Sequence, residues 1–181
     1  MWKQFVFYPS LGYNVTKNYF LQKRWPWYTR IDEVVVLGAL PFRSMADELV
    51  NKENIGGVVC MVEAHEIEHS WALSAKDWEK LGVRYHWLPT ADFFAAPSAE
   101  MLQPAVAFIN EVGASGKSVY VHCKAGRTRS ATVVACYLME KHNWLPNVAI
   151  EFMKSKRRQV VLRSLNWRSC NDYRRILDER P

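Results

Sequence analysis

A ten-residue segment, 121–130, brings together the side chains with the clearest chemical potential. It reads Val-His-Cys-Lys-Ala-Gly-Arg-Thr-Arg-Ser, with a β-branched run before it and a helical pattern after it. The backbone N–H groups of such a strand–loop–helix junction point at one spot, and the helix dipole makes that spot positive. The same field lowers the pKa of a cysteine from about 8.5 toward roughly 3.5–7.5. The segment therefore predicts a phosphate-binding loop with a thiolate at its base.

Each side chain of this loop has an expected task. Cys123 is the predicted nucleophile, and Arg129, six residues later, forks onto two phosphate oxygens. His122 orients the loop rather than acting as a base, because a thiolate that is already charged needs none. Ser130 donates to the sulfur and eases its departure. Gly126 permits the tight turn, and the predicted phosphate-binding residues are Lys124, Ala125, Gly126, Arg127, Thr128 and Arg129.

The alternative is a buried cysteine beside a core histidine in an ordinary strand–loop–helix turn. It suits Cys60 and Cys136, which lie in predicted elements without a glycine-rich basic loop. It does not suit Cys123, because His, Cys, Gly and Arg at these four places should occur by chance in about one of several thousand chains of this size. The four cysteines show no C-x-x-C spacing, and no metal-ligand pattern is visible. We therefore predict no disulfide framework, no metal and no cofactor.

A thiolate that attacks a phosphate ester needs an acid for the leaving oxygen. Asp92 is the one carboxylate in the predicted loop 90–98, which follows a predicted strand. Loops at the carboxyl ends of parallel strands meet at the ligand site, so Asp92 is the predicted general acid. One alternative is a turn or helix-capping role for Asp92. Another is Asp77 as the acid, although Asp77 lies on a predicted helix.

Strands and helices that alternate along the chain position this loop. Short β-branched runs predict strands at 34–37, 58–62, 83–88 and 118–122. Helical spacing and caps predict a helix ending near Val112 and further helices at 45–54 (capped by Ser44), 74–80, 127–142, 146–156 and 165–177. Pro104 either kinks the helix that ends near Val112 or lies in the first turn of a helix beginning near Gln103. The order predicts an α/β fold with a mostly parallel central sheet of four to five strands flanked by helices.

The chain has 181 residues, enough for one domain with its own core, which we predict over 31–181. Residues 1–30 form an arm without acidic side chains but with ten aromatic ones, Trp2, Phe5, Phe7, Tyr8, Tyr13, Tyr19, Phe20, Trp25, Trp27 and Tyr28. Such an arm suits an organelle presequence, a membrane-interface segment, or a segment packed on the domain. No uncharged apolar run reaches the roughly 18 residues of a membrane helix.

Basic charge gathers late in the chain. Residues 117–181 carry 14 basic and 5 acidic side chains, whereas residues 1–116 carry 10 and 13. A basic half favours a nucleic acid, a phosphorylated substrate or an anionic lipid as partner, or is only a solvated surface. Lys124, Arg127 and Arg129 make the predicted pocket cationic, which suits a doubly charged lipid headgroup. A second cluster could face an anionic membrane or form a solvated helix end: Lys154, Lys156, Arg157, Arg158 and Arg163.

His122-Cys123, five further residues and then Arg129-Ser130 match the signature of the cysteine-dependent protein-tyrosine-phosphatase superfamily, and the chain resembles its dual-specificity branch. Segments 27–32, 37–45, 80–83 and 119–131 further resemble the mitochondrial phosphatidylglycerophosphate phosphatases. The resemblance runs from about residue 7 to 175. It implies a dual-specificity-phosphatase-like fold, with Cys123 as nucleophile, Arg129 as phosphate ligand and Asp92 as acid. It also implies removal of the terminal phosphate of phosphatidylglycerophosphate, a step toward cardiolipin, at the matrix face of the mitochondrial inner membrane.

Two departures from the family pattern matter. The acidic loop after the second strand, which the resemblance links to substrate shaping, reads Glu63-Ala64-His65-Glu66, one acid fewer than in relatives. Arg163-Ser164 stands where relatives often have Arg-Pro.

We expect a lipid phosphatase that acts at an anionic membrane surface, as a monomer and without nucleic acid. The alternatives are a dual-specificity protein phosphatase, which would use the same pocket, and a silent phosphate-binding module, which the intact catalytic residues disfavour.

Overall fold

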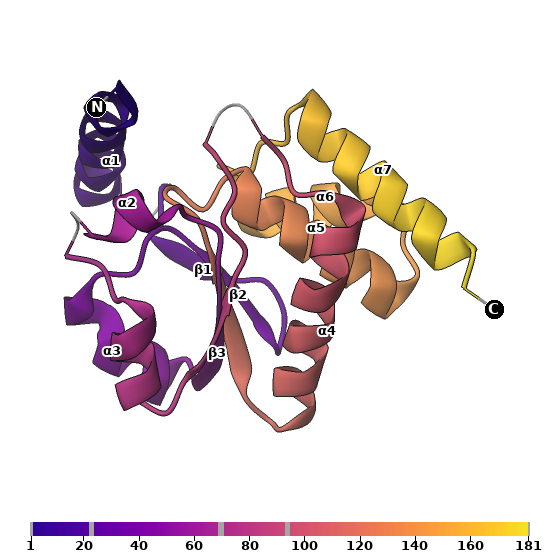
Figure 1. The fold of residues 1–181 in the computed structure, drawn as a ribbon, viewed down its shortest axis with the longest axis horizontal. Coiled ribbons are helices and arrows are strands. Elements are labelled where there is room, and N and C mark those ends of the chain that lie inside the picture. The colour runs from indigo at the N-terminus through magenta and orange to yellow at the C-terminus, as the bar shows by residue number, and fades with distance from the viewer. Residues whose placement is uncertain (1, 22–23, 69–70, 93–94, 181) are drawn as a thin grey trace.

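Five strands form one sheet at the centre of the computed structural model, which describes residues 2–21, 24–68, 71–92 and 95–180 (Figure 1). Across the sheet the order is β1 (Tyr28–Arg30), β2 (Val35–Gly38), β5 (Ser118–His122), β3 (Ile55–Cys60) and β4 (Arg84–Trp87). β1 pairs antiparallel with β2, and the other neighbouring strands pair in parallel. The predicted α/β fold with a mostly parallel sheet is confirmed.

The central strand β5 is buried at all of its positions, as a β-branched strand between two parallel neighbours should be. Its last residue, His122, stands opposite Gly38 of β2 on one side and Cys60 of β3 on the other. The three strands therefore end at one level. The loops that follow them meet at the same edge of the sheet, which is where ligands bind in open α/β folds.

Helices cover both faces of the sheet (Figure 1). On one side lie α4 (Ala99–Ala114), α5 (Arg129–His142), α6 (Pro146–Lys156) and α7 (Ser164–Asp178), and on the other lie α2 (Ala64–Glu68) and α3 (Ala75–Lys80), while α1 (Trp2–Phe20) contacts α2. α5 contacts the sheet as well as α4, α6 and α7, and every residue from Arg129 to Met139 is buried. It ends at Asn143, whose left-handed backbone (φ 53°) stops the helix. The first turn of α5, next to the loop after β5, is thus fixed by packing on several sides.

The observed start of α4 decides between the two predicted positions of Pro104. The helix starts at Ala99, where the Ser98 hydroxyl caps the first turn, so a start near Gln103 is wrong and Pro104 lies inside the helix. Proline cannot donate to the carbonyl four residues earlier. That carbonyl belongs to Glu100, an exposed residue, so water can take the place of the lost donor.

The predicted helix over 45–54 is instead an irregular helical segment. It contains a 3₁₀ turn over Arg43–Met45 and a π-helical turn over Glu48–Lys52. Ser44 lies inside the first of these turns, and Phe42 precedes that turn without a side-chain cap, so the predicted cap is wrong. The chain leaves the segment at Asn54, which has a positive φ of 55°, and enters β3.

The last residues of the predicted arm belong to the sheet, because Tyr28–Arg30 form its edge strand β1. Farther upstream the chain forms α1, whose Leu11 joins the buried core cluster. Among the described residues, no helix combines the length and the apolar character needed to cross a membrane.

Gly38, at the end of β2, has no room for a side chain. An added Cβ atom would lie 2.0 Å from the hydroxyl oxygen of Tyr120, which donates to the Ala39 carbonyl (2.7 Å). We expect Gly38→Ala to lower the free energy of unfolding by about 1–3 kcal/mol, measured by urea denaturation. Gly12→Ala is the control, because an added Cβ there has nothing within 4 Å and alanine favours the helix. Equal stability of the two variants would contradict this prediction.

Candidate active site

The loop between β5 and α5 has its carbonyl groups hydrogen-bonded from outside. The four successive carbonyls of residues 124–127 accept from Leu40 N, the Arg157 guanidinium and Val161 N, at 2.9–3.4 Å. In a planar trans peptide the N–H of the next residue points the opposite way. The N–H groups of residues 125–128 therefore face the inside of the loop, and a hydrogen bond from the Arg127 backbone reaches the sulfur of Cys123. The loop has the geometry of an anion cradle.

Gly126 is required at the turn of this loop for two reasons. Its φ is +63°, a left-handed value that glycine adopts without strain. A Cβ atom at Gly126 would also lie 2.4 Å from the carbonyl carbon of Gly38 and 2.8 Å from the backbone N of Ala39. The loop after β5 thus packs backbone against backbone on the loop after β2.

The thiol of Cys123 lies at the bottom of the loop and is 3% exposed. Burial raises the pKa of a thiol, but here the Arg129 guanidinium and hydrogen bonds from Ser130 hold the pKa of Cys123 below its usual value. The Ser130 hydroxyl donates to the sulfur at 3.2 Å. At Cys60 burial dominates, and the pKa rises to about 11. The cation and hydrogen bonds around Cys123 therefore favour a thiolate there, whereas burial keeps Cys60 a neutral thiol.

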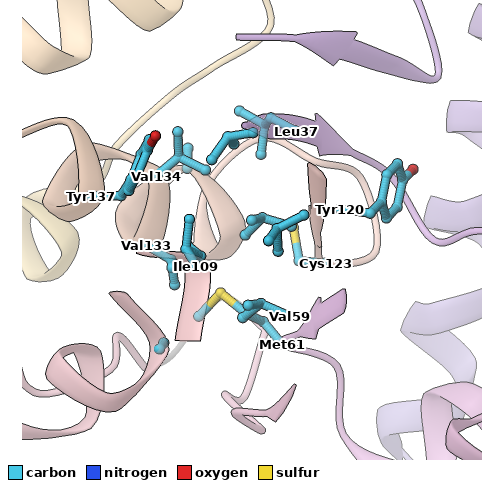
Figure 2. Close-up of a cluster of buried hydrophobic side chains, with 14 of the residues drawn as sticks. Leu37, Val59, Met61, Ile109, Tyr120, Cys123, Val133, Val134 and Tyr137 are labelled. Carbon is cyan, nitrogen blue, oxygen red and sulfur yellow. The ribbon is translucent and has the colours of Figure 1, made fainter. Parts of the chain in front are cut away.

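His122 is buried beneath the loop, and burial lowers its pKa to about 3. The ring is neutral at physiological pH, with Nδ1 3.4 Å from the Cys123 carbonyl oxygen, which fits the orienting role that the sequence predicts. Figure 2 shows Cys123 among buried apolar side chains, with Leu37 and Val59 on either side. The thiol thus rests on the hydrophobic core.

Arg129 is held by a partner that the sequence prediction missed. Its guanidinium pairs with both carboxylate oxygens of Glu66, at 2.9 and 3.2 Å, and donates to the carbonyls of Met61 (3.3 Å) and Thr90 (2.9 Å). Both Arg129 and Glu66 are 2% exposed, so the pair is desolvated and rigid. The signal that could have found Glu66 is the strand order, because the loop after β3 adjoins the loop after β5.

Asp92, the predicted acid, lines the same cavity as Cys123. Its Oδ2 lies 2.5 Å from Lys124 Nζ and 3.5 Å from Arg129 Nη2, and its side chain is 27% exposed. Asp77, the alternative acid, closes a capping box with Ser74 at the start of α3 and does not line this cavity. The structure therefore brings Asp92 to the loop and leaves Asp77 in a helix cap.

The cavity beside the loop has a volume of about 270 Å³. Besides the loop and Asp92, two other parts of the chain line it, α1 and the residues around the start of α7, through Ser10, Tyr13, Asn14, Val161, Arg163, Leu165 and Asn166. The sequence did not predict either wall. Within the described residues, no three His, Cys, Asp or Glu side chains gather so as to hold a metal ion.

Aromatic contacts hold α1 beside the loop. Lys17 of α1 lies over the ring of Trp25 (4.4 Å to its centroid), and the guanidinium of Arg127 lies over the same ring (5.2 Å). The side chain of Asn18 donates to the Trp25 carbonyl at 2.9 Å. Trp25 therefore links the predicted arm to the phosphate loop.

The second basic cluster of the sequence does not form one surface. Lys154 pairs with Glu151 (2.9 Å), Arg158 is exposed, and Arg163 lines the cavity. Arg157 is 1% exposed and lies under the phosphate loop, so its assignment to a membrane-facing patch is wrong. Sequence alone cannot separate a buried arginine from its exposed neighbour.

The family model of the dual specificity phosphatase catalytic domain matches residues 49–176. Phosphatidylglycerophosphatase and protein-tyrosine phosphatase 1 of Mus musculus is 43% identical over 162 residues, 87% of this chain and 82% of that protein. Its Homo sapiens counterpart is 40% identical over 159 residues, 87% of this chain and 79% of that protein.

The crystal structure of PTPMT1 in complex with PI(5)P superposes with a TM-score of 0.81 at 39% identity, covering 84% of this chain and 97% of that chain. The fold, the family model and the relatives agree with the motif around Cys123. The chain belongs to the dual specificity phosphatase family.

Proposed function

We propose that this chain is a phosphatidylglycerophosphate phosphatase that works through a cysteinyl-phosphate intermediate. The observation that carries the proposal is that Cys123, Arg129 and Asp92 share one cationic cavity, in a chain 40–43% identical to relatives named for this activity. The relative whose structure holds PI(5)P supports it further, because that ligand is also a phosphorylated lipid.

In the first step, the Cys123 thiolate attacks the phosphorus of the terminal phosphomonoester. A sulfur–phosphorus bond forms, and the bond from phosphorus to the ester oxygen breaks. Arg129 and the inward N–H groups of the loop stabilise the oxygens of the transferring group. Asp92, held beside Lys124, gives its proton to the leaving oxygen, which departs as a hydroxyl of phosphatidylglycerol.

In the second step, water attacks the phosphorus of the cysteinyl-phosphate. Asp92, now ionised, takes a proton from that water, so the attacking species gains hydroxide character. The sulfur–phosphorus bond breaks, and the Ser130 hydroxyl, 3.2 Å from the sulfur, stabilises the departing thiolate. Inorganic phosphate leaves, and Asp92 is protonated for the next cycle.

A dual-specificity protein phosphatase is the second candidate. The same relatives carry protein-tyrosine phosphatase in their names, and the cradle binds the phosphate of either substrate. A phosphate-binding module without activity is disfavoured, because the nucleophile, the arginine and the acid are all present.

We further propose that the chain acts as a monomer on an anionic membrane surface, at the matrix face of the mitochondrial inner membrane. Tyr19 and Phe20, at the end of α1, are 79% and 74% exposed. Aromatic side chains favour the membrane interface, and basic residues nearby, such as Arg24, add attraction to anionic lipids. Because α1 also lines the cavity, docking of α1 on a bilayer brings the cavity close to lipid headgroups.

A comparison of substrates tests the proposed function. We expect kcat/KM for vesicle-borne phosphatidylglycerophosphate to exceed that for a phosphotyrosine peptide by at least about tenfold, which is ~1.4 kcal/mol of transition-state binding. Cys123→Ser is the control and should abolish both activities while inorganic phosphate still binds, since the loop amides and Arg129 remain. Faster turnover of the peptide would make protein dephosphorylation the function.

The role of Asp92 is tested by its removal. Asp92→Ala should reduce the rate on the lipid by about 10²–10⁴-fold, with a smaller loss on an activated aryl phosphate, whose leaving group needs less protonation. Asp77→Ala is the matched control, and it should lower stability by about 0.5–2 kcal/mol without changing either rate in the folded protein. An equal loss on both substrates in Asp92→Ala would indicate a structural role for Asp92.

Membrane docking is tested with vesicles that contain cardiolipin. Replacing both Tyr19 and Phe20 by serine should weaken vesicle binding by about tenfold, the equivalent of ~1.4 kcal/mol of lost interfacial burial. Leu145→Ser is the control, because this exposed residue follows the end of α5 that is remote from the cavity. Added salt should also weaken binding steeply. Vesicle binding unaffected by the double substitution and by salt would contradict the proposed docking.

A further inference from the structure

Arg157, at the end of α6, is a buried cation that the proposed reaction leaves without a task. It is 1% exposed. All five N–H donors of its guanidinium are used, and each bonds to a neutral oxygen, at 2.9–3.4 Å: the carbonyls of Pro26, Trp27, Ala125 and Gly126 and the hydroxyl of Thr29. Among the described residues, no carboxylate pairs with it. Burial lowers its pKa to about 10, so it remains charged at neutral pH.

Two of these acceptors belong to the phosphate loop. Arg157 Nε donates to the Gly126 carbonyl (2.9 Å), and Nη2 donates to the Ala125 carbonyl (3.4 Å). Each carbonyl shares a rigid peptide plane with the next N–H. By holding the two carbonyls, Arg157 therefore sets the direction of the N–H groups of Gly126 and Arg127. If either peptide plane rotated, a carbonyl oxygen would face the bound phosphate and repel it.

We propose that Arg157 is a positioning residue that presets the phosphate loop, by holding two of its peptide planes with their N–H groups inward and by placing an uncompensated positive charge behind Cys123. The remaining three donors tie the loop to residues 26–29, just before and within β1. The inference rests on the proposed role of the loop as a phosphate site and not on the identity of the lipid.

The charge of Arg157 matters because the two other buried cations of the site are already paired with carboxylates. Arg129 is bound by Glu66, and Lys124 is bound by Asp92. The groups whose charges act on these residues come from several elements: Arg129 of α5 acts on Cys123, and Cys123 and Arg127 of the loop act on Arg157, while the buried phenol of Tyr120 stays neutral. A thiolate at Cys123 thus lies near one buried arginine whose charge no carboxylate offsets.

The alternative is that Arg157 only fastens residues 26–29 to the domain. That segment has a second tie, because Gln159 Nε2 also donates to the Pro26 carbonyl (2.9 Å). If Arg157 had only this role, its replacement would change thermal stability alone. A positioning residue would also change the thiol and the affinity for phosphate in the folded protein.

Three substitutions in the full chain separate these roles. Arg157→Met keeps the length of the side chain without its donors or charge, and Arg157→Lys keeps the charge with three donors instead of five. Arg158→Met is the matched control, because it removes the same charge from the adjacent, exposed position. The first measurement is the pH midpoint for alkylation of Cys123 by iodoacetamide. The alkylation of Cys123→Ser is subtracted, because it reports the other, buried thiols. The second is inhibition of aryl phosphate hydrolysis by inorganic phosphate, below the melting temperature of each variant.

We expect Arg157→Met to raise the alkylation midpoint by about one pH unit and to weaken phosphate inhibition about tenfold. Arg157→Lys should show smaller changes in both, and Arg158→Met should match the wild type. A folded Arg157→Met with both wild-type values would overturn the proposal. Where that variant does not fold, wild-type values in Arg157→Lys overturn it equally. Neither measurement uses a lipid, so a failure of the lipid assignment would not be confused with a failure of this inference.

Discussion

The site depends on one backbone constraint, that successive N–H groups around Cys123 must point at one spot. This arrangement turns the carbonyls of residues 124–127 outward, and buried carbonyls need donors. Leu40, after β2, and Arg157 and Val161, after α6, supply them. The position of β2 beside β5 and the return of the chain after α6 are therefore parts of the anion site. Packing alone would not explain why these segments direct hydrogen-bond donors toward the loop.

Paired charges keep the cationic site stable before phosphate enters. Burying an unpaired guanidinium is costly, and Glu66 offsets that cost for Arg129 with two hydrogen bonds. Lys124, 4% exposed, is matched by Asp92. In the proposed reaction, the phosphate dianion would take the place of the Asp92 carboxylate beside Lys124. The ion pair thus explains how a buried cation is tolerated in the loop.

The sequence predicted what local pattern and sheet topology determine. Cys123 and Gly126 lie in one loop and Arg129 begins the helix after it, and Asp92 lies beside them because parallel strands end at one edge. Glu66 and Arg157 were missed, since their roles come from contacts between distant segments. In sequence, Arg157 looks the same as Arg158, and only burial distinguishes the two. The prediction for segment 43–52 failed for a different reason. The spacing of its apolar residues is helical, but the segment contains a tighter 3₁₀ turn and a wider π-helical turn, which no residue pattern specifies.

The N-terminal helix α1 is relevant both to the proposed membrane docking and to the cavity. Its Lys17 contact with Trp25 is worth about 0.5–1 kcal/mol if exposed, and burial of Leu11 adds about 1.5–3 kcal/mol. In the proposed membrane docking, burial of Tyr19 and Phe20 in the bilayer would add a favourable term of similar size. Since Ser10, Tyr13 and Asn14 of the same helix line the cavity, the proposed docking of α1 on lipid would also stabilise one wall of the cavity in which the lipid phosphate would react.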